Sequence, residues 1–389
     1  MRKLRFGMIG GGPGAFIGAV HRRAAQFDGL AELVAGAFSR DPEKSAEQGR
    51  ELGLDPNRVY PSMEALIDTE ANRIEDRLDF IAIVTPNDAH FAAAKAALEA
   101  GFHVACDKPI TTTYEDACRL VELTNQTGQV FLLTHNYAGY PMIKQARHLV
   151  ATGALGTIRK IVVEYPQGWL AERIEASGQK QASWRTDPSR SGPAGALGDI
   201  GTHAEHLVRY VTGLEMEELF ADMAAMVDGR ALDDDSNILI HYAGGARGIL
   251  YASQVSQGEE NALSLRVYGT KAGLEWKQEH PNHLTVRSND APIQVYSRGH
   301  GPLCEAAAHA TRLPSGHPEG YPDAFANIYT NAIRVMAARL SGTTADALDH
   351  DFPSPEDGAR GIHFINCALE SATPRSWVNA RYSGPTMAS

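Results

Sequence analysis

The stretch "LRFGMIGGGPGAFIGAVHRRAAQF" (residues 4–27) decides the fold that we expect for this protein. Its first part, residues 4–9, is a short apolar run of the kind that forms a buried strand. A glycine-rich turn follows at residues 10–14, and residues 15–27 have the character of a helix. A strand, a glycine turn and a helix in this order are typical of the first unit of a dinucleotide-binding domain.

The glycine turn fits the pattern G-x-G-x-x-[G/A] through Gly10, Gly12 and Ala15. Gly10 permits the tight turn, Gly12 lets the backbone approach a pyrophosphate, and Ala15 keeps the helix close to the sheet. The helix N-terminus then faces the anion. A flexible glycine turn can match the same pattern, so its position directly after a strand is what favours dinucleotide binding.

The alternation of strands and helices continues along the chain. Strand candidates at 31–38, 78–85, 102–108 and 129–136 alternate with helix candidates at 42–53, 88–101 and 113–128, and beyond a helix near 141–152 strands dominate, at 157–165, 236–256, 262–279 and 283–288. We therefore predict an α/β fold with an N-terminal Rossmann domain over residues 1–135. Residues 136–389, including a late helix at 323–342, are expected to form an α+β domain with a large, mostly antiparallel open sheet for substrate binding and oligomerisation.

Composition limits the partners. The 389 residues carry a formal net charge of −11 and no Lys/Arg-rich run, which argues against nucleic acid. The four cysteines are scattered without a C-x-x-C motif, as expected for free thiols in a reducing compartment. No apolar run approaches the roughly 18 residues of a membrane span, and the apolar N-terminus is interpreted as a first strand. We expect a cytoplasmic protein that does not bind membranes.

The second strand ends in "AFSRD" (residues 37–41), at the position where this fold binds the adenosine ribose of a dinucleotide. An acidic residue there takes the ribose hydroxyls of NAD, whereas an arginine can take the 2′-phosphate of NADP. Ser39 and Arg40 occupy the tip and Asp41 comes one position late, which favours NADP over NAD. The alternative is that Arg40 stacks on adenine and both cofactors bind.

Three motifs together carry a family resemblance: the glycine turn, "TPNDAHFAAAKAALEAGFHVACDKP" (85–109) and "GALGDIGTH" (195–203). In order and spacing, over nearly the whole chain, they resemble the glucose–fructose oxidoreductase / inositol dehydrogenase / MocA family. The resemblance implies an NAD(P)-dependent oxidoreductase that acts on sugars, inositols or their derivatives. It also implies a Rossmann domain paired with an open-sheet domain, in a homodimer or homotetramer.

The resemblance also implies roles for single residues. Lys108, in the family's E-K-P position, should hydrogen-bond the reacting hydroxyl, and Asp199 and His203 match its D-x-x-x-H pair, with His203 as acid/base. Asp107 replaces the commoner Glu, and "HNYAGYP" (135–141) departs from the N-Y-R form. The residues expected to contact the cofactor are Gly10, Gly12, Gly14, Ala15, Phe16, Ser39, Arg40, Thr85, Pro86, Asn87, His90, Asp107, Lys108, Pro109 and Asn136. Those expected to contact substrate are Lys108, Tyr137, Trp184, Arg185, Asp199, His203 and His317.

The segment 196–213 is predicted to be a helix that ends at Gly213. At 100° per residue it has a core stripe (Ile200, Ala204, Leu207, Val208 and Val211), a solvated side (Thr202, Glu205 and Arg209) and a titratable stripe (Asp199, His203, His206 and Tyr210). A zinc site is disfavoured because a fourth ligand is not evident, so no metal is expected. Histidines bonded within a domain interface remain an alternative to an acid/base pair in which Asp199 orients His203.

Other candidates are weaker. In the expected loop 183–195, Trp184 offers an apolar face to a sugar ring and Arg185 a donor fork, although a surface loop with a core tryptophan is an equal alternative. His317 or Tyr321 in "GHPEGY" (316–321) could reach the pocket. The acidic run "LDDDSN" (232–237) is predicted to be a solvated turn before a strand.

These features predict an enzyme that oxidises a secondary hydroxyl of a sugar, glycoside or inositol, or reduces the ketone. Hydride passes to nicotinamide C4 while His203 takes the proton and Lys108 stabilises the alkoxide. Two alternatives stay open: a glycoside hydrolase that uses NAD for transient oxidation, elimination, hydration and re-reduction, and a non-catalytic dinucleotide-sensing regulator. The sequence identifies neither the sugar nor the carbon oxidised.

Overall fold

The computed structural model describes residues 2–384 and divides into two compact units. The first unit comprises Met1–Thr111, Glu115–Asn136 and Tyr321–Ala359, and the second comprises Thr112–Tyr114, Tyr137–Gly320 and Arg360–Ser389. The division at residue 135 expected from the sequence places 321–359 in the second domain, whereas the structure packs this segment into the first unit. Among residues 2–384, no helix combines the length and the apolar character needed to cross a bilayer.

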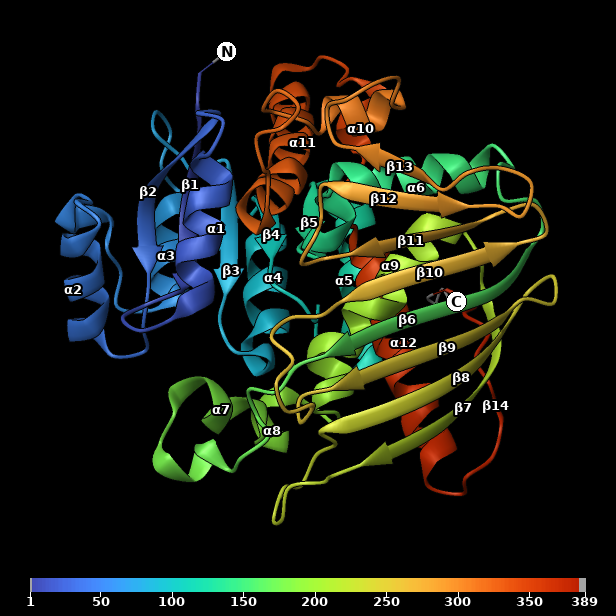
Figure 1. Ribbon diagram of the computed structural model, residues 1–389. Coiled ribbons are helices and arrows are strands. Elements are labelled where there is room, and N and C mark those ends of the chain that lie inside the picture. Colours follow the sequence, from blue (N-terminus) through green and yellow to red (C-terminus); the bar gives the residue numbers. More distant parts are fainter. Residues whose placement is uncertain (1, 385–389) are drawn as a thin grey trace. The chain divides into compact units, whose positions relative to one another are not determined.

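The first unit is built on a parallel sheet in the order β2-β1-β3-β4-β5 (Figure 1). Its strands are β1 (Leu4–Gly10), β2 (Ala31–Ala37), β3 (Phe80–Val84), β4 (His103–Cys106) and β5 (Phe131–Leu133). β3 and β4 are buried along their whole length, as expected for strands covered on both faces. The strand order changes direction around β1, so the carboxyl ends of these strands form the edge at which doubly wound sheets bind ligands.

Helices connect these strands: α1 (Phe16–Gln26), α2 (Pro42–Glu51), α3 (Met63–Ala71), α4 (His90–Glu99) and α5 (Tyr114–Thr127). The late helix α11 (Tyr321–Ser341) packs against α1. Its side chains Phe325, Ile328 and Tyr329 join the same hydrophobic core as Phe6 and Phe80 of the sheet. Burial of this apolar face explains why the segment belongs to the first unit although it is far away in sequence.

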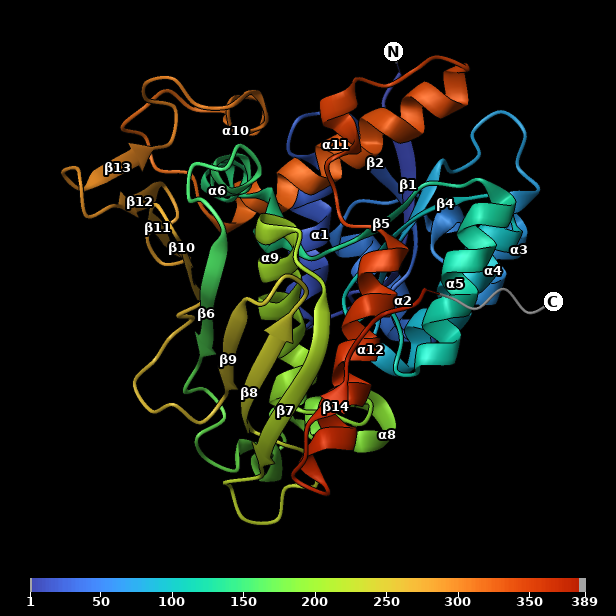
Figure 2. The same cartoon turned by 90° about the vertical axis from the view of Figure 1, so that its right-hand side faces the viewer.

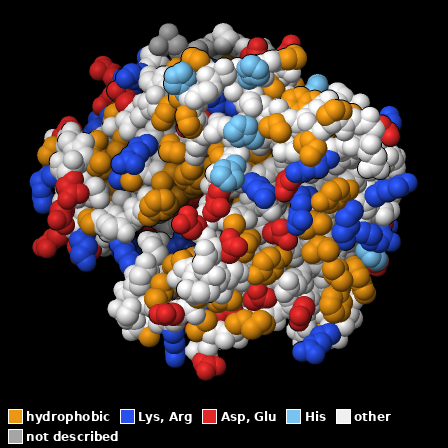
Figure 3. Space-filling model, in the orientation of Figure 1, with side chains coloured by type: hydrophobic (Ala, Val, Ile, Leu, Met, Phe, Trp, Pro, Cys, Tyr) orange, Lys and Arg blue, Asp and Glu red, His pale blue; other side chains and the backbone are white. Residues whose placement is uncertain are grey.

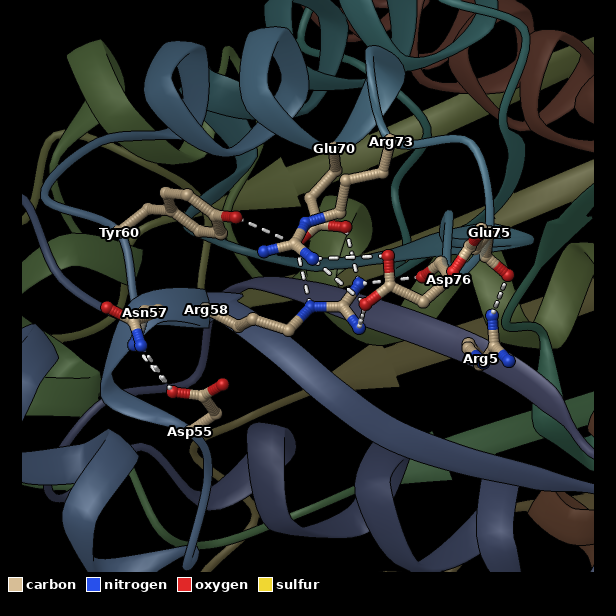
Figure 4. A network of polar contacts seen from close by, with 9 residues as sticks. All are labelled: Arg5, Asp55, Asn57, Arg58, Tyr60, Glu70, Arg73, Glu75 and Asp76. Carbon is tan, nitrogen blue, oxygen red and sulfur yellow. Dashed lines mark hydrogen bonds and ion pairs between the residues drawn. The ribbon is translucent and has the colours of Figure 1, made fainter.

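The helix α3, which the sequence analysis did not predict, is held by a buried polar network (Figure 4). Arg58 Nε donates to Glu70 Oε1 at 2.9 Å, and the Tyr60 hydroxyl donates to the same oxygen at 2.7 Å. Burial and the neighbouring Glu70 carboxylate raise the pKa of Tyr60 to about 12. Next to this network, Tyr60 N donates to Gly36 O of β2 at 2.8 Å. Because Tyr60 also binds Glu70 of α3, it attaches α3 to the edge of the sheet.

The second unit contains a nine-stranded sheet in the order β13-β12-β11-β10-β6-β9-β8-β7-β14. Its strands are β6 (Ile158–Pro166), β7 (Met216–Ala224), β8 (Asp235–Tyr242), β9 (Arg247–Ser253), β10 (Ser264–Gly269), β11 (Gly273–Lys277), β12 (His283–Arg287), β13 (Gln294–Ser297) and β14 (Val378–Asn379). All pairs are antiparallel except β6 with β9. The predicted fold class is therefore confirmed, while β7, β13 and β14 were not anticipated from the sequence.

Helices cover one face of this sheet and leave the other open (Figure 2). The covering helices are α6 (Pro141–Ala151), α9 (Thr202–Thr212) and the part of α12 (Pro355–Ala372) from Arg360 onward. On the open side, hydrophobic side chains lie among charged ones (Figure 3), as the exposed fractions of Leu239 (44%) and Tyr268 (42%) illustrate. One buried face and one exposed face produce the alternating burial seen along β8.

The segment 196–213 is helical, as predicted, but it begins with a π-helical turn over Leu197–Gly201 before α9. Gly213 ends the helix in the left-handed conformation, at φ 66°. The predicted core stripe is buried. The predicted solvated side is wrong, because Thr202 is 1% and Glu205 is 5% exposed. α9 lies against β6 and β9 and against α6, so the helix is covered on several sides.

Candidate active site

The glycine turn of the first unit has a backbone that only glycine adopts easily. Gly10, Gly11 and Gly14 have φ of 87°, 72° and 74°. A Cβ on Gly10 would lie 2.8 Å from Val84 O, and a Cβ on Gly12 would lie 2.6 Å from Phe38 O. The turn therefore fits closely between the ends of β3 and β2, where a side chain at either position would collide with backbone.

The close contact between this turn and α1 depends on a glycine that the motif did not include. A Cβ on Gly18 would lie 2.5 Å from Gly11 Cα. The sequence analysis gave Ala15 the role of keeping the helix close, but in the structure Ala15 is the N-cap of α1 and Gly18 makes the close contact. The cap has no side-chain hydrogen bond, and the first turn of α1 holds no acidic residue. Its amide groups therefore suit an anion such as a diphosphate.

Two buried polar atoms without hydrogen-bond partners lie near the carboxyl edge of the first sheet. Within residues 2–384, neither Thr85 Oγ1, just after β3, nor Asn136 Nδ2, after β5, has a partner. Unpaired buried polar atoms are costly unless a ligand or water completes them. Together with the glycine turn and Phe16, which is 68% exposed at the start of α1, they fit a dinucleotide cofactor.

At the adenosine end, Asp41 has a structural role as the N-cap of α2. Asp41 Oδ1 accepts from Glu43 N at 3.0 Å, and Asp41 N donates to Ser39 Oγ at 3.1 Å. Arg40 is exposed, and its guanidinium makes no hydrogen bond or ion pair within residues 2–384. A carboxylate that caps a helix is less available to ribose hydroxyls than one pointing away from the backbone.

Lys108 follows β4 and is joined to its neighbour Asp107 through the backbone. Asp107 Oδ1 accepts from Lys108 N and from Thr134 Oγ1, each at 2.9 Å. The Lys108–Pro109 peptide bond is cis. The two hydrogen bonds to Asp107 attach the segment that carries the lysine to the carboxyl ends of β4 and β5.

His90 is almost fully buried and binds backbone rather than solvent. Its Nδ1 lies 2.7 Å from Pro109 O and its Nε2 lies 3.0 Å from Thr85 O. Burial lowers the pKa of His90, although Asp107 and the two carbonyl groups oppose this. His90 therefore connects the ends of β3 and β4, and its position near the predicted nicotinamide residues follows from that contact.

In the second unit, Asp199 lies on the π-helical turn and accepts hydrogen bonds from two distant residues. Asp199 Oδ2 accepts from Gln254 Nε2 at 2.8 Å and from Arg185 Nε at 3.3 Å. The Arg185 guanidinium stacks on Trp184 at 4.2 Å from the ring centroid. The expected loop contains two short helices, α7 (Lys180–Arg185) and α8 (Pro188–Ser191), and α7 brings Arg185 to Asp199.

His203 is 7% exposed and lies against aromatic rings. Its ring meets Tyr137 edge-on, with centroids 4.9 Å apart. The Tyr137 hydroxyl is hydrogen-bonded to the Tyr165 hydroxyl, which donates to Asn261 Oδ1 at 2.8 Å. The structure thus gathers Tyr137 and His203 in one group and Arg185 and Asp199 in another. It adds Tyr165, Asn261 and Gln254, which no sequence motif had indicated.

The acidic run 232–237 is not the solvated turn that the sequence predicted. Asp233 accepts from Gly195 N at 2.6 Å, from Leu197 N at 2.8 Å and from Ser236 Oγ at 3.0 Å. Asp234 is 2% exposed and accepts from Arg230 Nη1 at 3.1 Å. Burial raises the pKa of Asp233. The carboxylate of Asp233 anchors the start of the segment that carries Asp199 and His203, because that segment presents unpaired backbone amides to it.

The remaining candidates have other contacts. His206 stacks on Tyr210, whose hydroxyl accepts from Lys144 Nζ at 3.3 Å. His317 is exposed, and its only polar contacts within residues 2–384 are through its backbone, including one from Arg298. Tyr321 begins α11 in the first unit. In the described part of the chain, no three His, Cys, Asp or Glu side chains are grouped so that they could hold a metal.

The fold and these residues define a class of protein. Its members have a Rossmann dinucleotide-binding unit and an open-sheet unit, and a helix of the open-sheet unit carries titratable side chains. Sequence comparisons agree with this class. Residues 4–135 match the family model described as oxidoreductase family, NAD-binding Rossmann fold, and residues 143–275 match the GFO/IDH/MocA C-terminal domain. The chain belongs to the GFO/IDH/MocA oxidoreductase family, so the predicted family and enzyme class are confirmed.

Two relatives by sequence and the solved structures of two proteins illustrate the similarity. The uncharacterized oxidoreductase YfiI of Bacillus subtilis is 34% identical, over 97% of both chains. An inositol dehydrogenase homolog from Azotobacter vinelandii, solved with NAD+, is 38% identical with a TM-score of 0.92 over 97% of both chains, and it was also solved with NADH and myo-inositol. Levoglucosan dehydrogenase of Pseudarthrobacter phenanthrenivorans is 27% identical, over 97% of this chain and 98% of the relative. A solved levoglucosan dehydrogenase with NADH and levoglucosan has a TM-score of 0.81 and 26% identity, over 97% of this chain and 99% of that one.

Proposed function

We propose that this protein is an NAD(P)-dependent dehydrogenase or reductase that acts on a secondary hydroxyl of a sugar, glycoside or inositol. The observation that carries the proposal is the presence of Lys108, Asp199 and His203 at the positions expected for the lysine and the D-x-x-x-H pair of this family. In the structure Asp107 and Asp199 each have further polar partners that hold them. The inositol and levoglucosan complexes of the relatives support a polyol or sugar as substrate.

In the proposed reaction a bound nicotinamide supplies the hydride acceptor at C4. Lys108 donates a hydrogen bond to the reacting hydroxyl and stabilises the negative charge that develops on its oxygen. His203 takes the hydroxyl proton in the oxidative direction and returns it in the reductive direction. Asp199 supports the protonated form of His203 through its charge, while Gln254 and Arg185 fix the orientation of that carboxylate.

For the cofactor we propose NADP or NAD, with NADP favoured by Ser39 and Arg40. Asp41 caps α2, which leaves Arg40 as the free charged side chain at this turn. The relatives solved with NAD+ or NADH support the alternative, in which Arg40 stacks on adenine. For the assembly we propose a homodimer or homotetramer that buries exposed side chains of the open sheet, such as Leu239, Tyr268 and Val295, which are 42–55% exposed.

The experiment that tests the activity is a screen of glycosides, free sugars and inositols with each cofactor, followed by the absorbance of reduced nicotinamide. Net cofactor reduction in proportion to product supports the dehydrogenase. Release of an aglycone with only catalytic amounts of cofactor would instead support the glycoside hydrolase. Cofactor binding without turnover of any compound would support the sensing regulator.

A further inference from the structure

A buried series of polar groups in the first unit connects α11 and α1 to the backbone of Lys108. The Tyr329 hydroxyl of α11 lies 2.7 Å from Nδ1 of His21 on α1, and His21 Nε2 lies 3.7 Å from Asp107 Oδ1 at the end of β4. Asp107 Oδ1 in turn accepts from Lys108 N. His21 is 0% and Tyr329 is 1% exposed, so bulk water does not replace these contacts.

The geometry selects one tautomer for His21. Its Nε2 is buried with no hydrogen-bond partner within residues 2–384 and faces the Asp107 carboxylate. A proton on Nδ1 alone would leave a lone pair on Nε2 opposite a negative oxygen in a dry site. A proton on Nε2 points a positive N–H toward Asp107 and lets the Tyr329 hydroxyl donate to Nδ1. The ring is held in place by an edge-on contact with Phe325, at 5.0 Å between centroids.

We propose that His21, with Tyr329 behind it, is a positioning residue for the hydride-transfer site. His21 directs the Asp107 carboxylate, and through that carboxylate it fixes the backbone of Lys108. The proposal rests on the role proposed above for Lys108. His21 belongs to no motif of the sequence, and its link to Asp107 depends on the packing of α1 against β2, β3 and α11.

The groups that surround Asp107 keep its carboxyl group charged. Burial by itself raises the pKa of Asp107, whereas His21 on α1, Lys108 next to it and His90 on α4 lower the pKa, and the balance holds it well below the ordinary value. Thr134 after β5 and Cys106 on β4 are its other polar neighbours, and burial keeps the Cys106 thiol neutral by raising its pKa. Removing His21 removes one of the lowering contributions, so the pKa of Asp107 rises.

The test compares kcat, the KM for substrate and the Kd for cofactor in His21→Phe, His21→Gln and Tyr329→Phe. A phenylalanine fills the site without a donor, so we expect kcat to fall by about tenfold or more while KM and Kd stay close to those of wild type. Glutamine keeps an N–H donor and should recover most of the lost kcat. Tyr329→Phe keeps the ring of His21 but removes the hydroxyl that binds it, so it should lower kcat by less.

A matched control separates positioning from simple destabilisation. His103 is also a buried histidine, 2% exposed, at the other end of β4, where its Nδ1 accepts from Val130 N. His103→Phe should lower stability and leave kcat close to that of wild type. If His21→Phe keeps the wild-type kcat, or if His21→Gln is no better than His21→Phe, the positioning role is wrong.

A second measurement does not need activity and keeps the two proposals apart. The carbon-13 signal of the Asp107 carboxyl, assigned by its loss in Asp107→Asn, is compared at neutral pH in wild type, His21→Phe and His21→Gln. A change of the signal in His21→Phe that His21→Gln largely reverses supports the contact even if no sugar or inositol is turned over, a result that would count against the proposed function alone. Identical signals in an active enzyme would overturn the inference and leave the proposed function standing.

Discussion

The glycine turn at residues 10–14 and the Asp199–His203 segment are specified by the chain in different ways. In the turn, the decisive features are backbone angles and the absence of side chains, as in the positive φ of Gly10, Gly11 and Gly14. In the Asp199–His203 segment, Asp199 depends on Arg185 and Gln254, which lie 14 and 55 positions away. The start of the segment depends on Asp233, which lies 38 positions from Gly195.

This difference shows that a sequence motif records local conformation but not the contacts made by distant residues. A turn whose conformation is set by its own residues can be recognised where it stands. A candidate catalytic side chain can be picked out by its motif as well, but the residues that orient it come from other elements and leave no local pattern. The predictions below test this distinction, beginning with the largest expected effect.

The first prediction concerns the two side chains to which we assign the proposed reaction. His203→Ala and Lys108→Ala should each lower kcat by about 10² to 10⁴-fold, because each removes a proton carrier or a charge stabiliser from the transition state. The Kd for the cofactor, measured by fluorescence titration, should stay close to that of wild type, because the glycine turn is unchanged. His148→Ala, at an exposed position on α6, is the control. Near-normal turnover in either variant would remove that residue from the mechanism.

The second prediction addresses a part of the Rossmann unit that is assembled over long range. Arg58→Met leaves Glu70, which is 0% exposed, as a buried carboxylate without its main partner. We expect a loss of about 3–5 kcal/mol in the free energy of unfolding, measured with urea. Lys44→Met removes a surface pair with Asp41 in which the lysine is 63% exposed, and it should cost less than about 1 kcal/mol. Equal losses would mean that the network in Figure 4 contributes no more than a surface pair.

The third prediction separates two acids of the run 232–237. Asp233→Asn weakens the anchor of Gly195 N and Leu197 N and should cost about 1–3 kcal/mol in the free energy of unfolding, with a lower kcat through displacement of Asp199. Asp235→Asn changes a less buried neighbour that contacts Asn237 and should leave both quantities almost unchanged. If the two variants behave alike, the buried anchor has no special role.

The fourth prediction is the smallest, because it affects an exposed side chain. Arg40→Asp should shift the ratio of kcat/KM for NADP to that for NAD toward NAD by about tenfold, since a carboxylate repels the 2′-phosphate and can bind ribose hydroxyls. Arg50→Asp, in the last turn of α2, is a control with the same change of charge. An unchanged ratio in Arg40→Asp would show that Arg40 does not read the phosphate.

The sequence predicted the larger part of the fold because its signals are local. Buried strands such as β3 are continuous apolar runs, and helices such as α4 end at a glycine. β7 was missed because its acidic and methionine residues do not give a clear strand pattern. The late helix was placed with the second domain because a linear reading of the chain cannot show that Phe325 and Tyr329 pack beside α1.

The sequence by itself determined the family and the glycine turn and singled out Lys108, Asp199 and His203 as candidates, because spacing along the chain is enough to recognise such motifs. Tertiary structure alone decided which groups orient these residues: Gln254 and Arg185 on Asp199, Asp233 at the start of their helix, and His21 next to Asp107. The physical reason is that hydrogen bonds and burial act over a few ångströms in space, whatever the separation along the chain.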